Sequence, residues 1–508
     1  MRARKRIFTL LFCLLTLTPF LLGARYNYSY YGEVIHSSAG MTYVTSFNAT
    51  QIGVKMDSPD DFAVHNDRIY ITSKSNNLIV LDVNFELIDG QNDAGDVVVD
   101  GKGTGIVPFT SFKHADPAIT EVFTLNGPNG VTVSDDHIWV CDTGNSRIIK
   151  LNRNYEVVLV SGTPDDATFE ELEDGSQLVY RPEKIAVDSS DRMYVVAKEV
   201  YEGIIELDSD GTFNRFTGVN PVSLTPWEIL VRQFMTQEQL KQVAKYLPTT
   251  FTNVAMSPRN FLYATALPTE SGDAKKSIQL INPKGIDVLT RKGYHIPMGD
   301  IEFNPSTHNY VVTYGPSTLK DIAYTEDGIY TVLDQKRCRL FTYDSEGNLL
   351  YINGESGAQA DKFSAQASAI AYLGDDLLVL DKETSNIIVY RLTEFGKAVN
   401  LATHYHQNGE FDEAATVWEQ ILELNTNYEN AYNGIGKYYL RQKEYKLAMD
   451  SFKYGHDDYY YSKAFKAYRN EIMRVAFAPL VITIFVLIVG YIVLKVYLKK
   501  KKEREDEL

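Results

Sequence analysis

A short unit of alternating polar and apolar residues recurs along residues 58–392. Each unit contains one strand-like run, a turn, a second run and a third run. Alternation with a period of two is typical of strands that bury one face. Because one small sheet cannot bury both of its faces, units in series predict antiparallel sheets packed around a common axis. The six first runs are DDFAV (60–64), NGVTV (129–133), EKIAV (183–187), TNVAM (252–256), KDIAY (320–324) and SAIAY (368–372).

The repeat predicts an all-β, six-bladed β-propeller over residues 26–393. The segment 26–50 precedes the first blade and has strand character, so we expect it to pair with the last blade and close the ring. A helical insertion is expected over 225–247, which opens on the Thr-Pro pair typical of a helix start. Residues 300–314 alternate again and predict a further strand pair or a degenerate seventh blade.

Several residues within the blades have a predicted structural role. Asp142, Asp334 and Asp381 end second strands, and we expect each to fix the turn that follows it, because Asp side chains bond nearby backbone N–H groups. Cys141 and Cys338 lie in strands of different blades. They are expected to be small buried residues and not partners in a disulfide.

From residue 394 the apolar period changes from that of a strand to that of a helix. Residues 394–472 contain two copies of one pattern, offset by 34 residues. The repeated positions hold small residues, which let paired helices approach, and aromatic residues, which fill the gap between pairs. A further helix over 461–472 is expected to cap the array. The superposed pairs are Ala402 with Gly436, Tyr405 with Tyr439, Ala414 with Ala448, and Trp418 with Phe452.

Two long apolar runs flank these modules. Residues 1–24 begin with basic residues and continue with apolar ones, which fits a signal peptide or an uncleaved signal anchor. Residues 475–494 are apolar and uncharged over a length that predicts one transmembrane helix. The basic tail 495–508 follows directly, so the positive-inside rule places it in the cytoplasm. The sequence therefore predicts a single-pass cell membrane protein whose bulk is extracytoplasmic.

The formal net charge of −16 argues against one class of partner. Basic residues gather at the two ends of the chain, so the modules between them are acidic, and a nucleic acid is not an expected ligand. Hydrophobic residues make up 44% and charged residues 23% of the sequence, which fits packed domains rather than a disordered chain. No serine-hydrolase, zinc-protease, P-loop or dinucleotide motif occurs in a suitable context.

Polar residues occur where the first strand of each blade begins, and in a propeller these positions converge at the mouth of the central channel. Carboxylate and amide oxygens around one axis are ligands that Ca²⁺ accepts, so a metal site is one hypothesis. The other is that these groups cap strand ends and face water. The strand entries are Asp60, Asp61, Asn129, Glu183, Asn253, Asp321 and Ser368, and the candidate metal ligands among them are Asp60, Asn129, Glu183, Asn253 and Asp321.

Two modules resemble known repeat families. The second blade, GPNGVTVSDDHIWVCDTGNSRIIKLN, resembles the NHL repeat in its Pro-x-Gly entry, its WVCDTGN centre and its RIIKL exit. That resemblance extends over roughly 58–392. The pattern in 394–472 resembles the tetratricopeptide repeat (TPR). The order of the modules, with one spanning helix after them, is similar to a group of bacterial membrane-anchored proteins, some of which occur with sugar-uptake ABC transport systems.

These resemblances imply two alternative functions. The first is an extracytoplasmic scaffold whose propeller and TPR-like surfaces recruit a protein or glycan partner, accessory to a transport or envelope system and without a cofactor. The second is a metal-dependent lactonase or lyase, because gluconolactonase relatives are six-bladed and hold a metal with Glu, Asn and Asp. Their ligand residues cannot be matched to this sequence one by one. The lack of catalytic motifs favours the scaffold over the enzyme.

Overall fold

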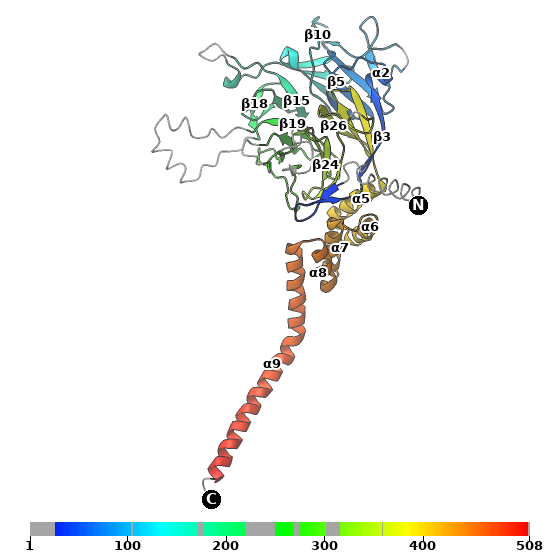
Figure 1. Cartoon of the computed structure of the whole chain (residues 1–508). Coiled ribbons are helices and arrows are strands. Elements are labelled where there is room, and N and C mark those ends of the chain that lie inside the picture. Colours follow the sequence, from blue (N-terminus) through cyan, green and yellow to red (C-terminus); the bar gives the residue numbers. More distant parts are fainter. Residues whose placement is uncertain are drawn as a thin grey trace, which may run out of the picture. The chain divides into compact units, whose positions relative to one another are not determined.

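The computed structural model divides the chain into two compact units, residues 1–397 and 398–508, which are described separately below (Figure 1). The segment 1–24, the insertion 225–247 and residues 301–314 lie outside the described residues, so the expectations for them stay predictions. The structure describes residues 26–102, 105–170, 177–218, 249–268, 274–300, 315–357 and 359–505.

Six antiparallel sheets in the described part of the first unit form the predicted six-bladed propeller. Within each blade, strands that follow one another in the sequence are neighbours in the sheet. Blade 1 contains β4 (Pro59–His65), β5 (Arg68–Ser73), β6 (Asn77–Asp82), β7 (Leu87–Gln91) and β8 (Val97–Val98), and blade 2 contains β11 (Val131–Val133), β12 (His137–Asp142), β13 (Arg147–Asn152) and β14 (Val157–Ser161). Blade 3 contains β15 (Pro182–Val187), β16 (Met193–Ala197), β17 (Ile204–Leu207) and β18 (Phe213–Thr217), and blade 4 contains β19 (Phe251–Met256), β20 (Leu262–Ala266) and β21 (Ile278–Ile281). Blade 5 contains β22 (Leu319–Tyr324), β23 (Tyr330–Asp334), β24 (Arg339–Tyr343) and β25 (Leu349–Asn353).

Blade 6 combines strands from both ends of the propeller sequence and closes the ring. Its outer strand β3 (Met41–Asn48) pairs antiparallel with β28 (Asn386–Leu392), which confirms the closure expected from the segment 26–50. Figure 1 shows β3, in blue, beside the yellow strands of this blade. Because a strand from the start of the propeller sequence completes the last blade, the ring leaves no open seam between its two ends. The remaining strands of blade 6 are β26 (Ala367–Leu373) and β27 (Asp376–Asp381).

A repeated hydrogen bond joins neighbouring blades close to the channel. In each case a side-chain hydroxyl or amide of one blade donates to a backbone carbonyl at or next to the start of the first strand of the following blade. Each such bond contributes about 1 kcal/mol net to stability. The pairs are Thr72 with Asn129 O, Thr143 with Pro182 O at 2.5 Å, Thr252 with Leu319 O at 2.7 Å, Gln335 with Ala367 O at 3.0 Å, and Ser368 with Pro59 O at 3.0 Å.

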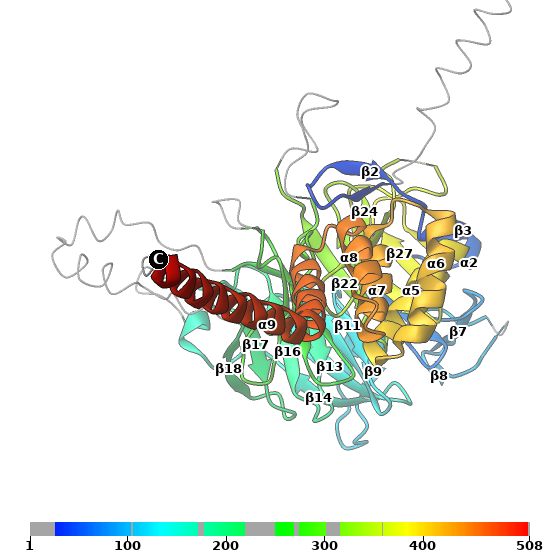
Figure 2. The same ribbon diagram turned by 90° about the horizontal axis from the view of Figure 1, so that it is seen from below.

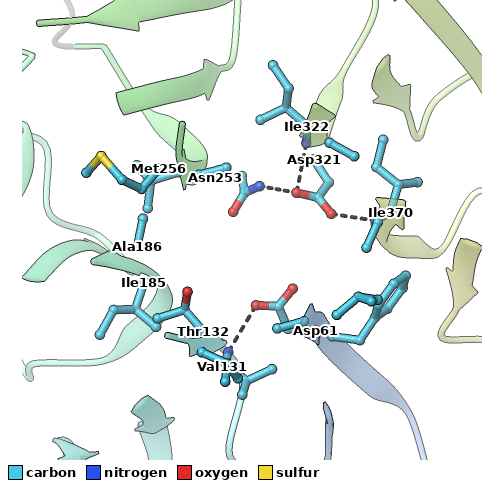
Figure 3. Close-up of a pocket in the computed structure, with 18 of the residues that line it drawn as sticks. Asp61, Val131, Thr132, Ile185, Ala186, Asn253, Met256, Asp321, Ile322 and Ile370 are labelled. Carbon is cyan, nitrogen blue, oxygen red and sulfur yellow. Dashed lines mark hydrogen bonds between the residues drawn. The ribbon is translucent and has the colours of Figure 1, made fainter. Parts of the chain in front are cut away.

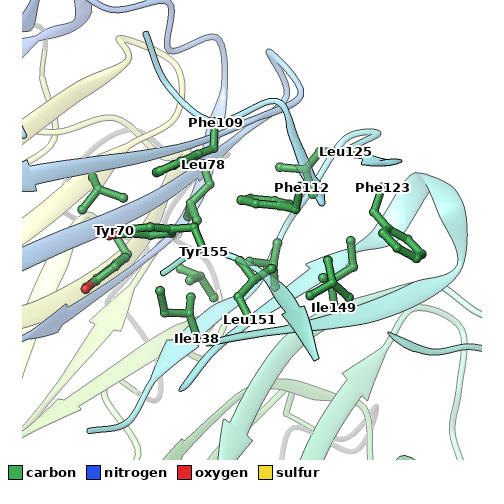
Figure 4. Close-up of a cluster of buried hydrophobic side chains, with 14 of the residues drawn as sticks. Tyr70, Leu78, Phe109, Phe112, Phe123, Leu125, Ile138, Ile149, Leu151 and Tyr155 are labelled. Atoms are coloured by element: carbon green, nitrogen blue, oxygen red, sulfur yellow. The ribbon is translucent and has the colours of Figure 1, made fainter. Parts of the chain in front are cut away.

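Apolar side chains fill the spaces between blades. Figure 4 shows the cluster between blades 1 and 2, where the rings of Phe109 and Tyr155 stack with their centroids 4.3 Å apart. The Tyr155 hydroxyl donates to the buried carboxylate of Asp89, so its polar end is satisfied. Cys141 and Cys338 are both buried and form no disulfide, as predicted. Full burial of each large apolar side chain contributes about 1.5–3 kcal/mol, so these clusters supply much of the stability of the ring.

The aspartates that end second strands fix two segments of chain each. Asp142, Asp334 and Asp381 are almost wholly buried. Each accepts a hydrogen bond from the turn that follows it, as predicted. Each also accepts one from the segment that enters its own blade. The donors from the turns are Asn145 Nδ2, Lys336 N and Glu383 N, and the donors from the entering segments are Asn126 N, Thr318 N and Ser364 N.

An N-terminal hairpin packs on blade 5 through a buried polar cluster. The Tyr26 hydroxyl donates to Asp300 at 3.1 Å, and the Tyr28 hydroxyl donates to the same carboxylate. Arg337 lies 3.4 Å from Asp300 and balances its charge. The ring of Tyr28 stacks on His295, with 4.3 Å between centroids. Tyrosines of this segment therefore have structural roles. The two strands of the hairpin are β1 (Tyr26–Tyr28) and β2 (Val34–His36).

The second unit is helical (Figure 2). Its repeated positions pack closely: a Cβ on Gly436 would lie 2.6 Å from the ring of Phe452, so the small residue is required there. Ala402, Ala414 and Ala448 are buried. The short helices are α5 (Glu394–Asn408), which begins in the first unit, α6 (Phe411–Leu424), α7 (Glu429–Arg441) and α8 (Tyr445–Tyr454).

Helix α9 (Asp458–Glu505) continues this unit for 48 residues. Its first turns pack on α8, where Ala464 is buried and the rings of Phe452 and Tyr460 stack 5.5 Å apart. The expected capping helix 461–472 and the expected span 475–494 are therefore parts of one helix. Among the described residues, this helix is long and apolar enough to cross a membrane.

Candidate functional site

The first strands of all six blades surround a cavity of about 340 Å³ in the central channel (Figure 3). In blades 1, 4 and 5 the cavity lining begins at the residue that follows a bulge in the first strand, and in blades 2, 3 and 6 it begins one residue later. From there the cavity extends toward the C-terminal ends of these strands. Its volume is more than ten times the ~30 Å³ that a water molecule occupies in the liquid, so it has room for an organic ligand. The lining residues are 61–64, 131–133, 185–187, 253–256, 321–324 and 370–372.

A bulge near the start of the first strand determines which side chains reach the channel. The pairing shifts by one residue between Pro59 and Asp61, and at the matching place in blades 3 to 6. A slip of one residue along a strand exchanges the faces to which side chains point. The residues after the bulge, together with Gly130 of blade 2, occupy equivalent positions around the axis. They are Asp61, Gly130, Lys184, Asn253, Asp321 and Ala369, and we call the four polar ones (Asp61, Lys184, Asn253 and Asp321) the polar ring.

Lys184 and Asp61 form a buried ion pair across blade 2. The Lys184 ammonium lies 2.6 Å from Asp61 Oδ1, although these residues belong to blades 3 and 1. Blade 2 contributes Gly130 between them, and a Cβ there would lie 2.7 Å from the carbonyl of Glu183 and 3.0 Å from Lys184 Cα. Glycine is therefore needed for the strand that bears Lys184 to approach. The other Asp61 oxygen accepts the N–H of Val131 at 3.1 Å.

Asp321 and Asn253 form the second pair of the polar ring. The Asn253 amide nitrogen donates to Asp321 Oδ1, which also accepts the N–H of Ile322 at 2.8 Å. Asp321 Oδ2 accepts the N–H of Ile370 at 2.6 Å. Blade 6 carries Ala369 at the ring position, so no side chain there separates Asp321 from this N–H group. Figure 3 shows both carboxylates and the Asn253 amide directed into the channel.

Burial and charge oppose one another in this ring. Burial raises the pKa of Asp61, although the charge of Lys184 acts against the rise. Burial likewise raises the pKa of Asp321, to about 6, with Lys184 again opposing it. Burial disfavours charge on Lys184, but Asp61 and Asp321 outweigh it and hold the pKa of Lys184 above its usual value. The ammonium is therefore the group that keeps two buried carboxylates in one channel.

Three of the five candidate metal ligands lie before the polar ring and do not line the cavity. Asp60 pairs with Lys382, and the amide of Asn129, oriented to donate, lies 3.3 Å from Asp60. Glu183 is near Lys320, whose pKa burial lowers while the Glu183 charge opposes the effect. Among the described residues, no three His, Cys, Asp or Glu side chains are grouped to hold a metal ion. Calcium binding stays a prediction, and lysines lie among its proposed ligands.

Sequence reasoning identified Asn253 and Asp321 in the channel but missed the role of Lys184. The sequence interpretation considered only side chains whose oxygen atoms can bind a metal ion, and in the EKIAV run that side chain is Glu183. Comparison of the six first runs at the second position would have found Lys184, because this column holds Asp61 and Asp321 as well. The Lys184–Asp61 ion pair also depends on Gly130, the glycine at the equivalent position of blade 2.

A row of small residues lines the cavity beyond the polar ring. Two positions after each ring residue, five blades carry alanine and blade 2 carries threonine. Larger side chains at these positions would fill the channel, so the small residues maintain the cavity. We call this set the alanine row; it consists of Ala63, Thr132, Ala186, Ala255, Ala323 and Ala371.

Comparison with known proteins supports the NHL repeat of the second blade. Residues 125–151, which belong to blade 2, match the NHL repeat. Similar solved structures include a streptogramin B lyase, 10% identical, with 70% of this chain and 100% of that chain covered and a TM-score of 0.38. A catalytically inactive virginiamycin B lyase from Staphylococcus aureus with quinupristin is 13% identical, with 68% and 98% covered and a TM-score of 0.37. A Bacteroides thetaiotaomicron protein of unknown function is 11% identical, with 71% and 78% covered and a TM-score of 0.37. No curated protein matches the chain.

Proposed function

We propose that this chain is a membrane-anchored scaffold that recruits a protein or glycan partner outside the cytoplasm. The pairing within the polar ring carries the proposal. Lys184 bonds Asp61, and Asn253 bonds Asp321. A general acid, general base or metal ligand must be free to meet its substrate or ion, whereas these groups are held by one another and by backbone N–H groups. The channel therefore supports a binding role better than a catalytic one.

Helix α9 supports the membrane anchor. Its residues 475–494 are apolar, and the lysines at 499–502 follow within the same helix. By the positive-inside rule the lysines lie in the cytoplasm, and the propeller is then extracytoplasmic once the segment 1–24 has directed export. The helical unit joins the span without a break, so the scaffold would present this unit at the membrane surface.

The helical unit supplies the second binding surface, and we assign it to the TPR type. Its 34-residue period and the contact between Gly436 and Phe452 support this assignment. Arrays of paired helices offer extended surfaces to partner peptides. A component of a membrane transport or envelope system is the partner that the anchored position favours.

Co-purification from native membranes tests the scaffold. The full chain, with an affinity tag on the cytoplasmic tail, is solubilised in mild detergent and purified at low and high salt. The matched control is a chimera in which α9 and the tail follow an unrelated exported domain. We expect the full chain alone to retain a partner in a fixed ratio. Recovery of the same proteins with the chimera would contradict the proposal.

The enzyme alternative has a separate readout. The purified chain is incubated with lactones and with streptogramin-type cyclic esters, with Ca²⁺ or Mg²⁺ and with a chelator. We expect no turnover above that of the chimera. Turnover that the chelator abolishes and the metal restores would contradict the scaffold proposal and support a metal-dependent lactonase or lyase.

A further inference from the structure

The side-chain donors of the polar ring are directed at its carboxylates, whereas one acceptor of the ring lacks a donor among the described residues. The Asn253 nitrogen donates to Asp321, and the Lys184 ammonium donates to Asp61. The Asn253 side-chain oxygen accepts from no group in the described residues, although Asn253 is only 5% exposed. Figure 3 shows this oxygen on the cavity side of the amide. An acceptor that faces the cavity without a protein donor can accept a hydrogen bond from a ligand.

The charge of the ring favours a cation as that donor. Two carboxylates, Asp61 and Asp321, face one ammonium, Lys184, which leaves one negative charge in the polar ring. In the layer before the ring, two carboxylates and two lysines balance one another (Asp60, Glu183, Lys320 and Lys382). Blades 2 and 6 bring only Gly130 and Ala369 to the level of the polar ring. A positively charged ligand would restore the balance, because charges interact strongly where water is excluded.

Apolar side chains in the wall of the cavity suit the body of an organic cation. The alanine row and the apolar residues beside it surround the space beyond the polar ring. Two tyrosines of the lining have already used their hydroxyls: Tyr324 donates to Met256 O, and Tyr372 bonds Thr331 at 2.6 Å. Their rings remain as aromatic wall, which is favourable for an organic ammonium ion.

We propose that the channel cavity binds a compact organic ammonium ion. Its N–H groups donate to the Asn253 side-chain oxygen and to Asp321, and its apolar body lies against the alanine row. The ligand reaches the polar ring from the mouth at the C-terminal ends of the first strands. This proposal concerns a small ligand in the channel and does not depend on which partner the scaffold recruits.

Binding of matched small molecules to the full chain in detergent tests the proposal. The probe is 2-phenylethylammonium, compared with 2-phenylethanol, which lacks the charge, and with phenylacetate, which reverses it. Binding is measured by isothermal titration calorimetry at millimolar ligand. We expect the ammonium ion to bind at least about tenfold more tightly than the alcohol, a difference of about 1.4 kcal/mol, and the anion not to bind.

Three variants distinguish a loss of ligand binding from a loss of folding. Asp321→Asn removes the charge and is expected to weaken ammonium binding about tenfold or more. Thr132→Leu fills the cavity and is expected to abolish binding, even if Asp321→Asn fails to fold. Thr120→Leu places the same change on an exposed loop and is expected to leave binding unchanged. Equal affinity for ammonium and alcohol, unchanged binding by Thr132→Leu, or no binding of the ammonium ion would overturn the proposal.

Discussion

Removal of the Lys184 charge is the perturbation whose size follows most directly from the structure. Lys184→Met keeps the length of the side chain but leaves two buried carboxylates without their cation. The Lys184 side chain is 5% exposed and that of Asp61 is 10% exposed, so water cannot replace the lost partner. The change therefore tests whether the ion pair holds the channel together.

Coulomb's law gives the scale of the effect. At the 2.6 Å separation and an effective dielectric constant of about 20, the gross attraction is about 6 kcal/mol. Part of this offsets the cost of burying the charges, and removal of one partner from a buried pair typically costs about 3–5 kcal/mol. We expect that loss in the free energy of unfolding at neutral pH.

The assay is guanidinium unfolding of the full chain in detergent, followed by tryptophan fluorescence in a Trp227→Phe, Trp418→Phe background, so that the signal comes from Trp139, which is fully buried in blade 2. The matched control is Lys113→Met, whose partner Asp96 lies 3.4 Å away at the surface, and this change is expected to cost less than about 1 kcal/mol. The cost of Lys184→Met should shrink near pH 5, where Asp321 is protonated and needs no cation. A cost below about 1 kcal/mol, or the same cost at both pH values, would refute the role given to Lys184.

Three further predictions concern other parts of the molecule. Burial lowers the pKa of His295 to about 4, so the unfolded chain takes up the proton first as pH falls below about 6.5. His295→Phe keeps the ring against Tyr28 and should remove about 3 kcal/mol of acid destabilisation between pH 6.5 and 4, measured by unfolding at a series of pH values. Gly130→Val should destabilise the propeller by about 1–3 kcal/mol in thermal unfolding, because its Cβ meets the strand that bears Lys184. Gly436→Leu should separate α7 from α8 and increase hydrogen exchange there without affecting the propeller, and uniform exchange across both units would contradict this.

The alternation of the blades was predictable because a strand with one buried face leaves a period of two in the sequence. The closing strand followed from the same physics, since the edge of β28 requires a partner. The turn aspartates Asp142, Asp334 and Asp381 followed from the chemistry of their short side chains.

The channel was predictable only in part. Asp60 and Asp61 are adjacent, and the bulge that follows Pro59 decides which of them reaches the cavity. A bulge is a feature of strand pairing and leaves no fixed mark in one strand's sequence. The Lys184–Asp61 pair also depends on the gap at Gly130, a property of three blades at once. The sequence indicates the cavity only after the six blades are aligned, because the alanine row then shows a small residue at the same position in every blade.

Crosslinking in intact membranes tests the central claim, a membrane-anchored scaffold, most directly. The full chain and the α9 chimera are crosslinked before solubilisation, and the attached proteins are quantified by mass spectrometry. We expect one main partner, in fixed proportion to the full chain and absent from the chimera. Crosslinks of the full chain only to itself, or to the same proteins as the chimera, would contradict it.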